Sequence, residues 1–238
     1  MKRPKSSVFQ FREFALHQNK QVMPLTTDAI LLGAWTRAEN SVHLLEVGTG
    51  TGILSLMMAQ RFPRLKITAI DISKKATTLA KHNVKKSPWG DRINVLLQDF
   101  SQMSPFSYDH IVSNPPFFND SLSSPDPHRT QSKHTHTLSF KTLMNCGKNW
   151  LTTGGKLSVI LDNESGKQML EYCTQTEFHC LRKCMVRPHP DKKPHRMMLE
   201  FIYGSESLSP IKVEELVISD RKGEYTAEFK KLTGAFYL

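Results

Sequence analysis

A short apolar segment, residues 42–47, runs directly into the sequence Gly48-Thr-Gly-Thr-Gly52 and then into an amphipathic stretch, residues 53–62. This order predicts a buried strand, a tight loop and a helix, which is how a doubly wound α/β sheet begins. Glycines allow a ligand to approach the backbone of such a loop closely. The spacing is G-x-G-x-G rather than the dinucleotide pattern G-x-G-x-x-G, and Glu46 lies inside the motif. A carboxylate there would repel a pyrophosphate, so the loop favours a ligand that carries positive charge.

Apolar strand segments and helical patterns continue to alternate after this motif. Strands are predicted over residues 66–71, 93–100, 108–112 and, after a turn at Gly154-Gly155, 157–161; helices are predicted over 73–84 and 140–151. Residues 182–187 and 197–203 predict two more strands, which would close the sheet as an antiparallel pair. Together these segments predict an α/β fold with a mostly parallel sheet.

The predicted strand over residues 108–112 leads into the sequence Asn114-Pro-Pro-Phe117. Neither Pro115 nor Pro116 can donate to a strand ladder, so the strand must stop there, and each proline favours an extended residue before it. The Asn114 amide oxygen and the Pro115 carbonyl can accept the two N–H groups of an amine on a flat ring, while Phe117 stacks on the ring. The plainer alternative is a turn, because Asn-Pro is a common way to begin one.

Acidic residues follow two other predicted strands. Asp71 is placed to bind the two hydroxyls of a ribose, although it also suits the N-terminus of the helix that follows. Asp99 can accept from an adenine amine, with Phe100 or Ile72 against the ring. Thr26-Thr27-Asp28 predicts a helix N-terminus, and its acceptor groups can also contact a ligand beside the glycine loop.

The net charge of +10 and the pI of about 9.5 favour an anionic partner, either a nucleic acid or a membrane surface. No apolar run is long enough to span a bilayer and no apolar segment follows the basic start of the chain, so we expect a cytoplasmic protein. Four cysteines form no C-x-x-C pair, and we expect them to pack in a reducing compartment rather than bind a metal. Residues 119–137 and 187–196 predict irregular, basic segments.

Taken in order, Glu46-x-Gly48-x-Gly50-x-Gly52, Asp71, Asp99-Phe100 and Asn114-Pro-Pro-Phe117 resemble the class I S-adenosylmethionine-dependent methyltransferases, in the branch that methylates amino groups. The sulfonium of that cofactor matches the positive ligand inferred above. The resemblance implies a Rossmann-like class I methyltransferase fold, with a mostly parallel seven-stranded sheet and an antiparallel C-terminal strand pair. It implies a single domain over 1–238, in which 1–40 form a basic segment and capping helix and 41–238 the catalytic core. The expected cofactor-binding residues are Thr27, Asp28, Glu46 (methionine end), Gly48, Gly50, Gly52, Asp71, Ile72, Asp99, Phe100 and Asn114.

A closer resemblance covers residues 11–238. The sequences Asp28-Ala-Ile-Leu-Leu-Gly-Ala-Trp35, Ser87-Pro-Trp-Gly-Asp-Arg-Ile-Asn-Val95 and the C-terminal Ala235-Phe-Tyr-Leu238 are similar to the bacterial tRNA(Val) (adenine-N6)-methyltransferases. This implies methylation of N6 on the adenine 3′ of the anticodon, with Asn114, Pro115, Pro116 and Phe117 as catalytic residues. Many relatives have tyrosine at position 117, and phenylalanine keeps the stacking face. We expect a protein that is monomeric without RNA and that contacts tRNA through Lys2, Arg3, Lys5, Arg129, Lys133, His134, Arg187, Lys192, Lys193 and Arg196.

Three other functions remain compatible with these motifs. A protein glutamine methyltransferase also uses Asn-Pro-Pro-aromatic, but its substrate does not require a charge of +10. An rRNA guanine-N2 methyltransferase carries out similar chemistry on another amine. A non-catalytic RNA-binding scaffold on the same fold would have no need for the complete glycine loop and Asn114 motif.

Overall fold

The computed structural model describes residues 8–103, 106–115, 138–204 and 210–237. Its strands are β1 (Val8–Gln10), β2 (Ala15–His17), β3 (His43–Val47), β4 (Lys66–Asp71), β5 (Ile93–Leu97), β6 (Tyr108–Ser113), β7 (Leu151–Asp162), β8 (Phe178–Arg187), β9 (Arg196–Tyr203) and β10 (Lys212–Val217). Its helices are α1 (Thr27–Trp35), α2 (Ile53–Arg61), α3 (Lys74–Lys86), α5 (Phe140–Gly147), α6 (Asn163–Cys173) and α7 (Ala227–Thr233), with short 3-10 turns η1 (Gly90–Arg92) and η2 (Phe100–Gln102).

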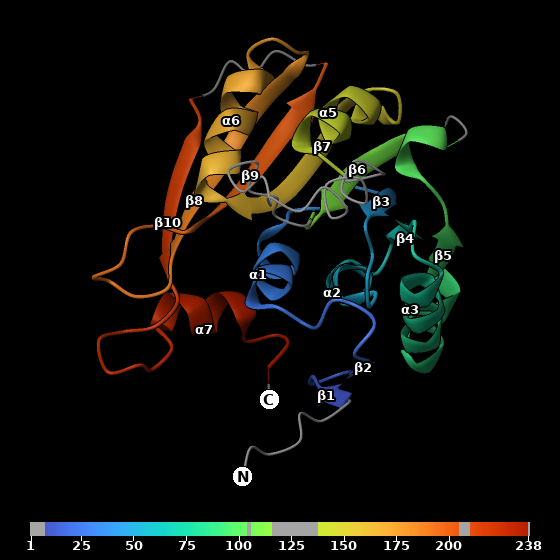
Figure 1. Ribbon diagram of the computed structural model, residues 1–238, viewed down its shortest axis with the longest axis horizontal. Helices are drawn as coiled ribbons and strands as arrows, with labels where there is room; N and C mark the ends of the chain where they lie inside the picture. Colours follow the sequence, from blue (N-terminus) through green and yellow to red (C-terminus); the bar gives the residue numbers. More distant parts are fainter. Residues whose placement is uncertain (1–7, 104–105, 116–137, 205–209, 238) are drawn as a thin grey trace, which may run out of the picture.

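The larger of the two described sheets has eight strands in the order β10-β8-β9-β7-β6-β3-β4-β5 (Figure 1). Strands β3 to β7 are parallel to one another, and β9 runs antiparallel between β7 and β8. The expected mostly parallel α/β sheet with an antiparallel C-terminal pair is confirmed. The structure adds an eighth strand, β10, which pairs in parallel with β8 at the edge and was not expected.

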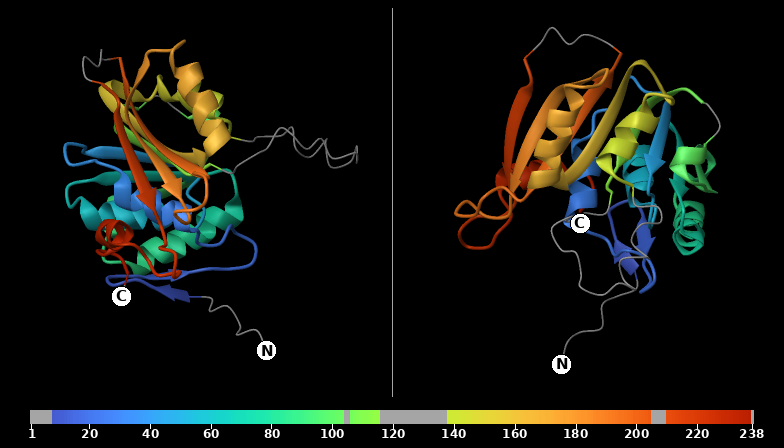
Figure 2. Two further views of the ribbon diagram at one scale, coloured as in Figure 1. Left: turned by 90° about the vertical axis from the view of Figure 1, so that its left-hand side faces the viewer. Right: turned by 45° about the horizontal axis from the view of Figure 1, so that its top comes forward.

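Helices cover both faces of this sheet (Figure 2). One apolar core joins α1, α2 and α3 to inward residues such as Leu44, Val112 and Ile160. The other lies under α5 and α6 and includes Leu45, Ile111 and Leu157. Burial on both faces explains why the central strands are nearly continuous apolar runs in the sequence. Cys180 and Cys184 are buried in these two cores, one in each.

The N-termini of the helices follow their capping residues. Thr26 Oγ1 accepts from the Ala29 amide at 3.3 Å before α1, and Ser73 Oγ accepts from the Ala76 amide at 3.3 Å before α3. The predicted turn at residues 154–155 is wrong. Gly154 adopts a φ of 81°, and β7 continues past it as one long strand whose pairing with β6 shifts register there.

One row of polar side chains crosses the face of the sheet that α1 covers, and we call it the buried polar row. Arg182 Nε donates to Glu200 Oε1 at 3.1 Å, and Arg182 Nη2 donates to the Trp35 carbonyl at 3.0 Å. Ser158 Oγ donates to Glu200 at 3.4 Å and lies 2.9 Å from His110 Nε2. Burial lowers the pKa of His110 to about 4, so this ring is neutral in the folded protein. The row connects β6, β7, β9 and β8 to the end of α1.

The small hairpin of β1 and β2 packs beneath the large sheet beside the C-terminal residues. The Arg12 amide donates to the Phe236 carbonyl at 2.9 Å, and the fully buried ring of Phe11 lies 6.3 Å from that of Tyr237. The first and last described segments therefore share one aromatic cluster.

Within the described part of the chain, every helix is too short or too polar to cross a membrane.

Candidate active site

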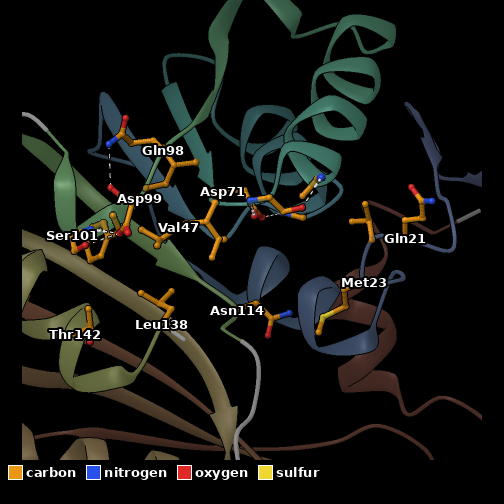
Figure 3. Close-up of a pocket in the computed structure, with 18 residues that line it drawn as sticks. Gln21, Met23, Val47, Asp71, Gln98, Asp99, Ser101, Asn114, Leu138 and Thr142 are labelled. Carbon is orange, nitrogen blue, oxygen red and sulfur yellow. Dashed lines mark hydrogen bonds between the residues drawn. The ribbon is translucent and has the colours of Figure 1, made fainter. Parts of the chain in front are cut away.

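A cavity of about 650 Å³ opens at the carboxyl ends of β3, β4 and β6. Ligands bind at this edge of open α/β sheets because the loops that follow parallel strands meet there. In Figure 3, Asp99 and Ser101 stand at one end of the cavity and Gln21 and Met23 at the other, with Asp71 and Asn114 between them. The cavity is lined by Gln21, Val22, Met23, Val47, Gly48, Gly50, Ile70, Asp71, Ile72, Ser73, Ala76, Gln98, Asp99, Phe100, Ser101, Asn114, Leu138 and Thr142.

The three glycines of the loop have different surroundings. Gly48 and Gly50 have φ values of 78° and 55° and line the cavity. Apart from their chain neighbours, no described residue has an atom within 4 Å of the position where a side chain would begin. Gly52, with a φ of 83°, faces Ala80 of α3, and a Cβ there would lie 3.4 Å from the Ala80 Cβ. The first two glycines therefore open the backbone to the cavity, whereas Gly52 allows α2 to begin close against α3.

Asp71 lies at the end of β4 and lines the cavity. Its Oδ2 accepts from the Gly50 amide at 2.9 Å and its Oδ1 from the Ser73 amide at 2.8 Å. A carboxylate has about four acceptor positions, so these two bonds fix its orientation and leave acceptor capacity for a ligand. Ile72 follows with 55% of its surface exposed and also lines the cavity.

The end of the cavity beyond β5 is formed by Asp99 and Phe100. Asp99 Oδ1 accepts from the amide and the hydroxyl of Ser101, at 2.8 and 2.7 Å. Phe100 is buried, with its ring centroid 5.0 Å from that of Trp150. An apolar wall beside a carboxylate suits a flat heterocycle with an exocyclic amine.

Asn114 follows β6 and is half-buried in the wall of the cavity, next to the buried Pro115. Ser113 Oγ donates to the Val47 carbonyl at 2.8 Å and so fixes the end of β6 against β3. The amide is thereby placed beside the glycine loop. Pro116 and Phe117 lie outside the described residues.

Glu46 does not line the cavity. It is buried beneath the glycine loop, where its Oε2 accepts from Thr49 Oγ1 at 2.8 Å, from the Ser55 amide at 3.1 Å and from the Ser55 hydroxyl. Burial raises the pKa of Glu46 to about 7, against the opposing effect of these hydrogen bonds. The structure therefore places this carboxyl group where it holds the loop from behind, rather than where it would face the methionine end of a ligand.

The other predicted contacts before the glycine loop are also outside this cavity. Asp28 Oδ2 accepts from Arg196 Nε at 2.9 Å, which joins the first turn of α1 to the start of β9. Thr27 lines a separate cavity of about 1030 Å³ between the N-terminal hairpin and α7.

Of the predicted RNA contacts, Lys2, Arg3, Lys5, Arg129, Lys133 and His134 lie outside the described residues. Arg187 is paired with Glu215 and Arg196 with Asp28. Lys192 and Lys193 are exposed and make no ion pair with a described residue. Only these two cations of the segment 187–196 remain available to a phosphate without first breaking an internal pair.

Sequence reasoning missed both walls that complete the cavity. Gln21, Val22 and Met23 form one, on a loop that is held by the bond from the Leu25 amide to Gln18 Oε1 at 2.8 Å. Leu138 and Thr142 form the other. A Met-Pro pair before a capped helix has no local signal of ligand contact, so only the three-dimensional placement reveals it.

Comparison with known proteins identifies the family. A family model for the methyltransferase small domain matches residues 26–182. A tRNA1(Val) (adenine(37)-N6)-methyltransferase from Bacteroides thetaiotaomicron is 37% identical over 232 residues, which cover 97% of both chains. One from Vibrio vulnificus is 37% identical over 235 residues, covering 98% of this chain and 97% of the relative. The chain belongs to this family.

Solved structures agree at the level of the fold. A predicted O-methyltransferase from Agrobacterium tumefaciens superposes with a TM-score of 0.69 over 88% of this chain and 96% of the other, at 19% identity. A methyltransferase from Pyrococcus furiosus gives 0.58 over 81% and 90%, at 18% identity. At these identities the likeness concerns the class I methyltransferase fold alone.

Proposed function

We propose that the protein transfers a methyl group from S-adenosylmethionine to N6 of an adenine in tRNA, the adenine at position 37 of tRNA1(Val). The observation that carries this proposal is the pairing of full-length similarity to enzymes of that name with an asparagine amide in the wall of the cavity. We place the protein in the cytoplasm, with its tRNA, and expect a monomer when RNA is absent.

The residues around the cavity fit the cofactor. Asp71 has free acceptor capacity for the ribose hydroxyls, Asp99 and Phe100 suit the adenine, and the open backbone at Gly48 and Gly50 accommodates the chain between sulfur and carboxylate. When bound, S-adenosylmethionine supplies an electrophilic methyl group on a positively charged sulfur. Glu46 acts indirectly in this arrangement, by fixing Thr49 and Ser55 on either side of the glycines.

Asn114 orients and activates the target amine. The lone pair of an adenine N6 is delocalised into the ring, so the amine is a poor nucleophile. Accepting hydrogen bonds at the Asn114 oxygen and the Pro115 carbonyl favours a pyramidal nitrogen and stabilises the positive charge that develops on it. No strong base is needed, because the proton can leave after transfer. The adenine must leave its stack to reach the cavity, which costs only a few kcal/mol in an unpaired loop.

Product analysis tests this function directly. Purified protein is incubated with radiolabelled S-adenosylmethionine and unmodified valine tRNA, and the digested nucleosides are separated. The expected product is N6-methyladenosine, with none formed on a transcript in which guanosine replaces adenosine 37. A methylated guanosine would instead favour an rRNA-type guanine-N2 activity, and label in protein glutamine would favour a glutamine methyltransferase.

Substitutions at Phe117 test the remaining catalytic assignment. Phe117→Tyr should retain substantial activity because the stacking face is kept, whereas Phe117→Ala should lose most of it because the flipped base is no longer held. Equal activity in both variants would remove Phe117 from the proposed site.

A further inference from the structure

Helix α3 carries a strong and uncompensated positive charge. Five of its thirteen residues are lysine and none is acidic, and all five lysines (Lys74, Lys75, Lys81, Lys85 and Lys86) are exposed. None of them makes an ion pair with a residue that the structure describes. By contrast, α6 on the opposite face of the sheet carries Glu164 and Glu171, and its Lys167 is paired with Glu164 at 3.6 Å.

The charged helix starts at the candidate active site. Ser73, which caps α3, and Ala76 in its first turn both line the cavity, so Lys74 lies next to the wall. The twelve steps from Lys74 to Lys86 extend about 18 Å along the helix axis. Lys81 and Lys85 face a hollow of about 520 Å³ between α3 and β5, the edge strand of the sheet, beside Asn94 and Leu96.

From these observations we infer that the exposed face of α3 binds the phosphate backbone of the RNA whose base enters the cavity. This inference rests on the proposed function and adds a surface that the basic segments identified in the sequence do not include. Lys74, Lys81 and Lys85 are spaced at i, i+7 and i+11, so they form one stripe that leads away from the cavity. A backbone that follows this stripe meets several cations in succession and ends with a nucleotide at the mouth of the cavity.

The same face is poorly suited to a membrane. A helix that lies on a bilayer inserts an apolar side, but the apolar residues of α3 (Ala76, Leu79, Ala80 and Val84) are buried against the sheet. The exposed positions besides the lysines are Thr78 and His82, and His82 packs edge-on against His17 at 4.7 Å. Only an anionic, polar partner matches this surface.

The test compares two triple variants that remove the same charge from opposite faces. Lys74→Gln, Lys81→Gln and Lys85→Gln together should weaken tRNA binding at least tenfold near 0.1 M salt and reduce the slope of log affinity against log salt by ~2–3. The matched control, Lys148→Gln, Lys167→Gln and Lys183→Gln, should change affinity less than threefold. Glutamine favours helices nearly as well as lysine, so the α3 variant should melt like the parent protein. Thermal unfolding of both triple variants checks that each is folded.

Activity and cofactor measurements separate this inference from the proposed function. The α3 variant should bind S-adenosylmethionine normally by calorimetry and raise KM for tRNA while kcat at saturating tRNA stays within about threefold. If the parent protein forms N6-methyladenosine and the α3 variant has an unchanged KM, the surface is misplaced although the function stands. If the parent protein neither binds nor methylates tRNA, both fail. Loss of binding to phosphatidylserine vesicles with unchanged tRNA affinity would also overturn the inference and assign the face to a membrane.

Discussion

Polar side chains occupy two places in this protein, the wall of the cavity and the buried polar row, and their hydrogen bonds differ. Glu200 accepts from Arg182 and Ser158, and Arg182 also reaches the Trp35 carbonyl, so these groups satisfy one another inside the protein. Asp71 in the cavity is held by two backbone amides and still has room for further donors. We therefore interpret the buried polar row as a support of the fold, and we propose that the cavity residues bind a ligand.

The largest expected effect comes from breaking the buried row. Arg182→Met should leave the Glu200 carboxylate without its main partner and lower the free energy of unfolding by about 3–5 kcal/mol. The double variant Arg182→Met with Glu200→Leu should recover much of this loss, because it removes both charges. Urea unfolding followed by circular dichroism measures both values. A loss below 1 kcal/mol in the single variant would show that the pair is not a structural support.

Asn114→Ala should reduce activity and leave the stability of the protein nearly unchanged. Its unfolding free energy should stay within about 1 kcal/mol of the parent, whereas kcat for methyl transfer should fall by about 10²–10³-fold, as for the loss of one transition-state hydrogen bond. Binding of cofactor and tRNA should change little. Asn149→Ala, at an exposed asparagine outside the cavity, is the control and should keep parental activity. Full activity in Asn114→Ala would contradict the catalytic role.

Two buried titratable groups, Glu46 and His110, should make the stability of the protein depend on pH in opposite directions. The raised pKa of Glu46, about 7 against 4.5, makes stability fall as pH rises from 4.5 to 7. The lowered pKa of His110, about 4 against 6.5, makes stability rise as pH rises from 4 to 6.5. Each shift corresponds to about 3 kcal/mol, so between pH 4.5 and 6.5 the two contributions nearly cancel.

Single variants separate these contributions. Over that range Glu46→Gln should become more stable with rising pH, and His110→Gln should become less stable. Urea midpoints at several pH values test this. Parallel profiles in the two variants would contradict the assigned shifts.

The smallest effect is expected on the affinity for the cofactor. Asp71→Ala should weaken S-adenosylmethionine binding roughly 10- to 100-fold, the usual range for a lost hydrogen bond to a charged group. Asp91→Ala, an exposed aspartate in η1, should leave it unchanged. Isothermal titration calorimetry gives both constants, and equal affinities would remove Asp71 from the proposed ribose site.

The sequence predicted the elements whose signals are local. Residues 66–71 form β4 as expected, and Ser73 ends the loop before α3 as its N-cap. The glycine loop, Asp71, Asp99, Phe100 and Asn114 do meet around one cavity, because parallel strands bring their carboxyl ends together.

What the sequence could not predict depends on contacts between distant segments. In strand β10, polar and apolar residues alternate only weakly and two residues are glutamates. Its pairing with β8 is therefore what makes it a strand. Glu46 was expected to face a ligand, but Thr49 and Ser55 both donate hydrogen bonds to its carboxylate and hold it away from the cavity. Met23 reaches the cavity because its loop folds back from the N-terminal hairpin, and no neighbouring residue signals this.

The contact between the N-terminal hairpin and the C-terminal residues has a consequence for the chain while it is being synthesised. Arg12 and its partner Tyr237 are 225 residues apart. At about 5–20 residues per second, roughly 10–45 s pass on the ribosome between the two. During that time Phe11, fully buried in the finished protein, lacks the C-terminal part of its cover. Nascent chains should therefore keep the aromatic segment around Phe11 accessible to chaperones until the residues around Tyr237 have been synthesised and released from the ribosome.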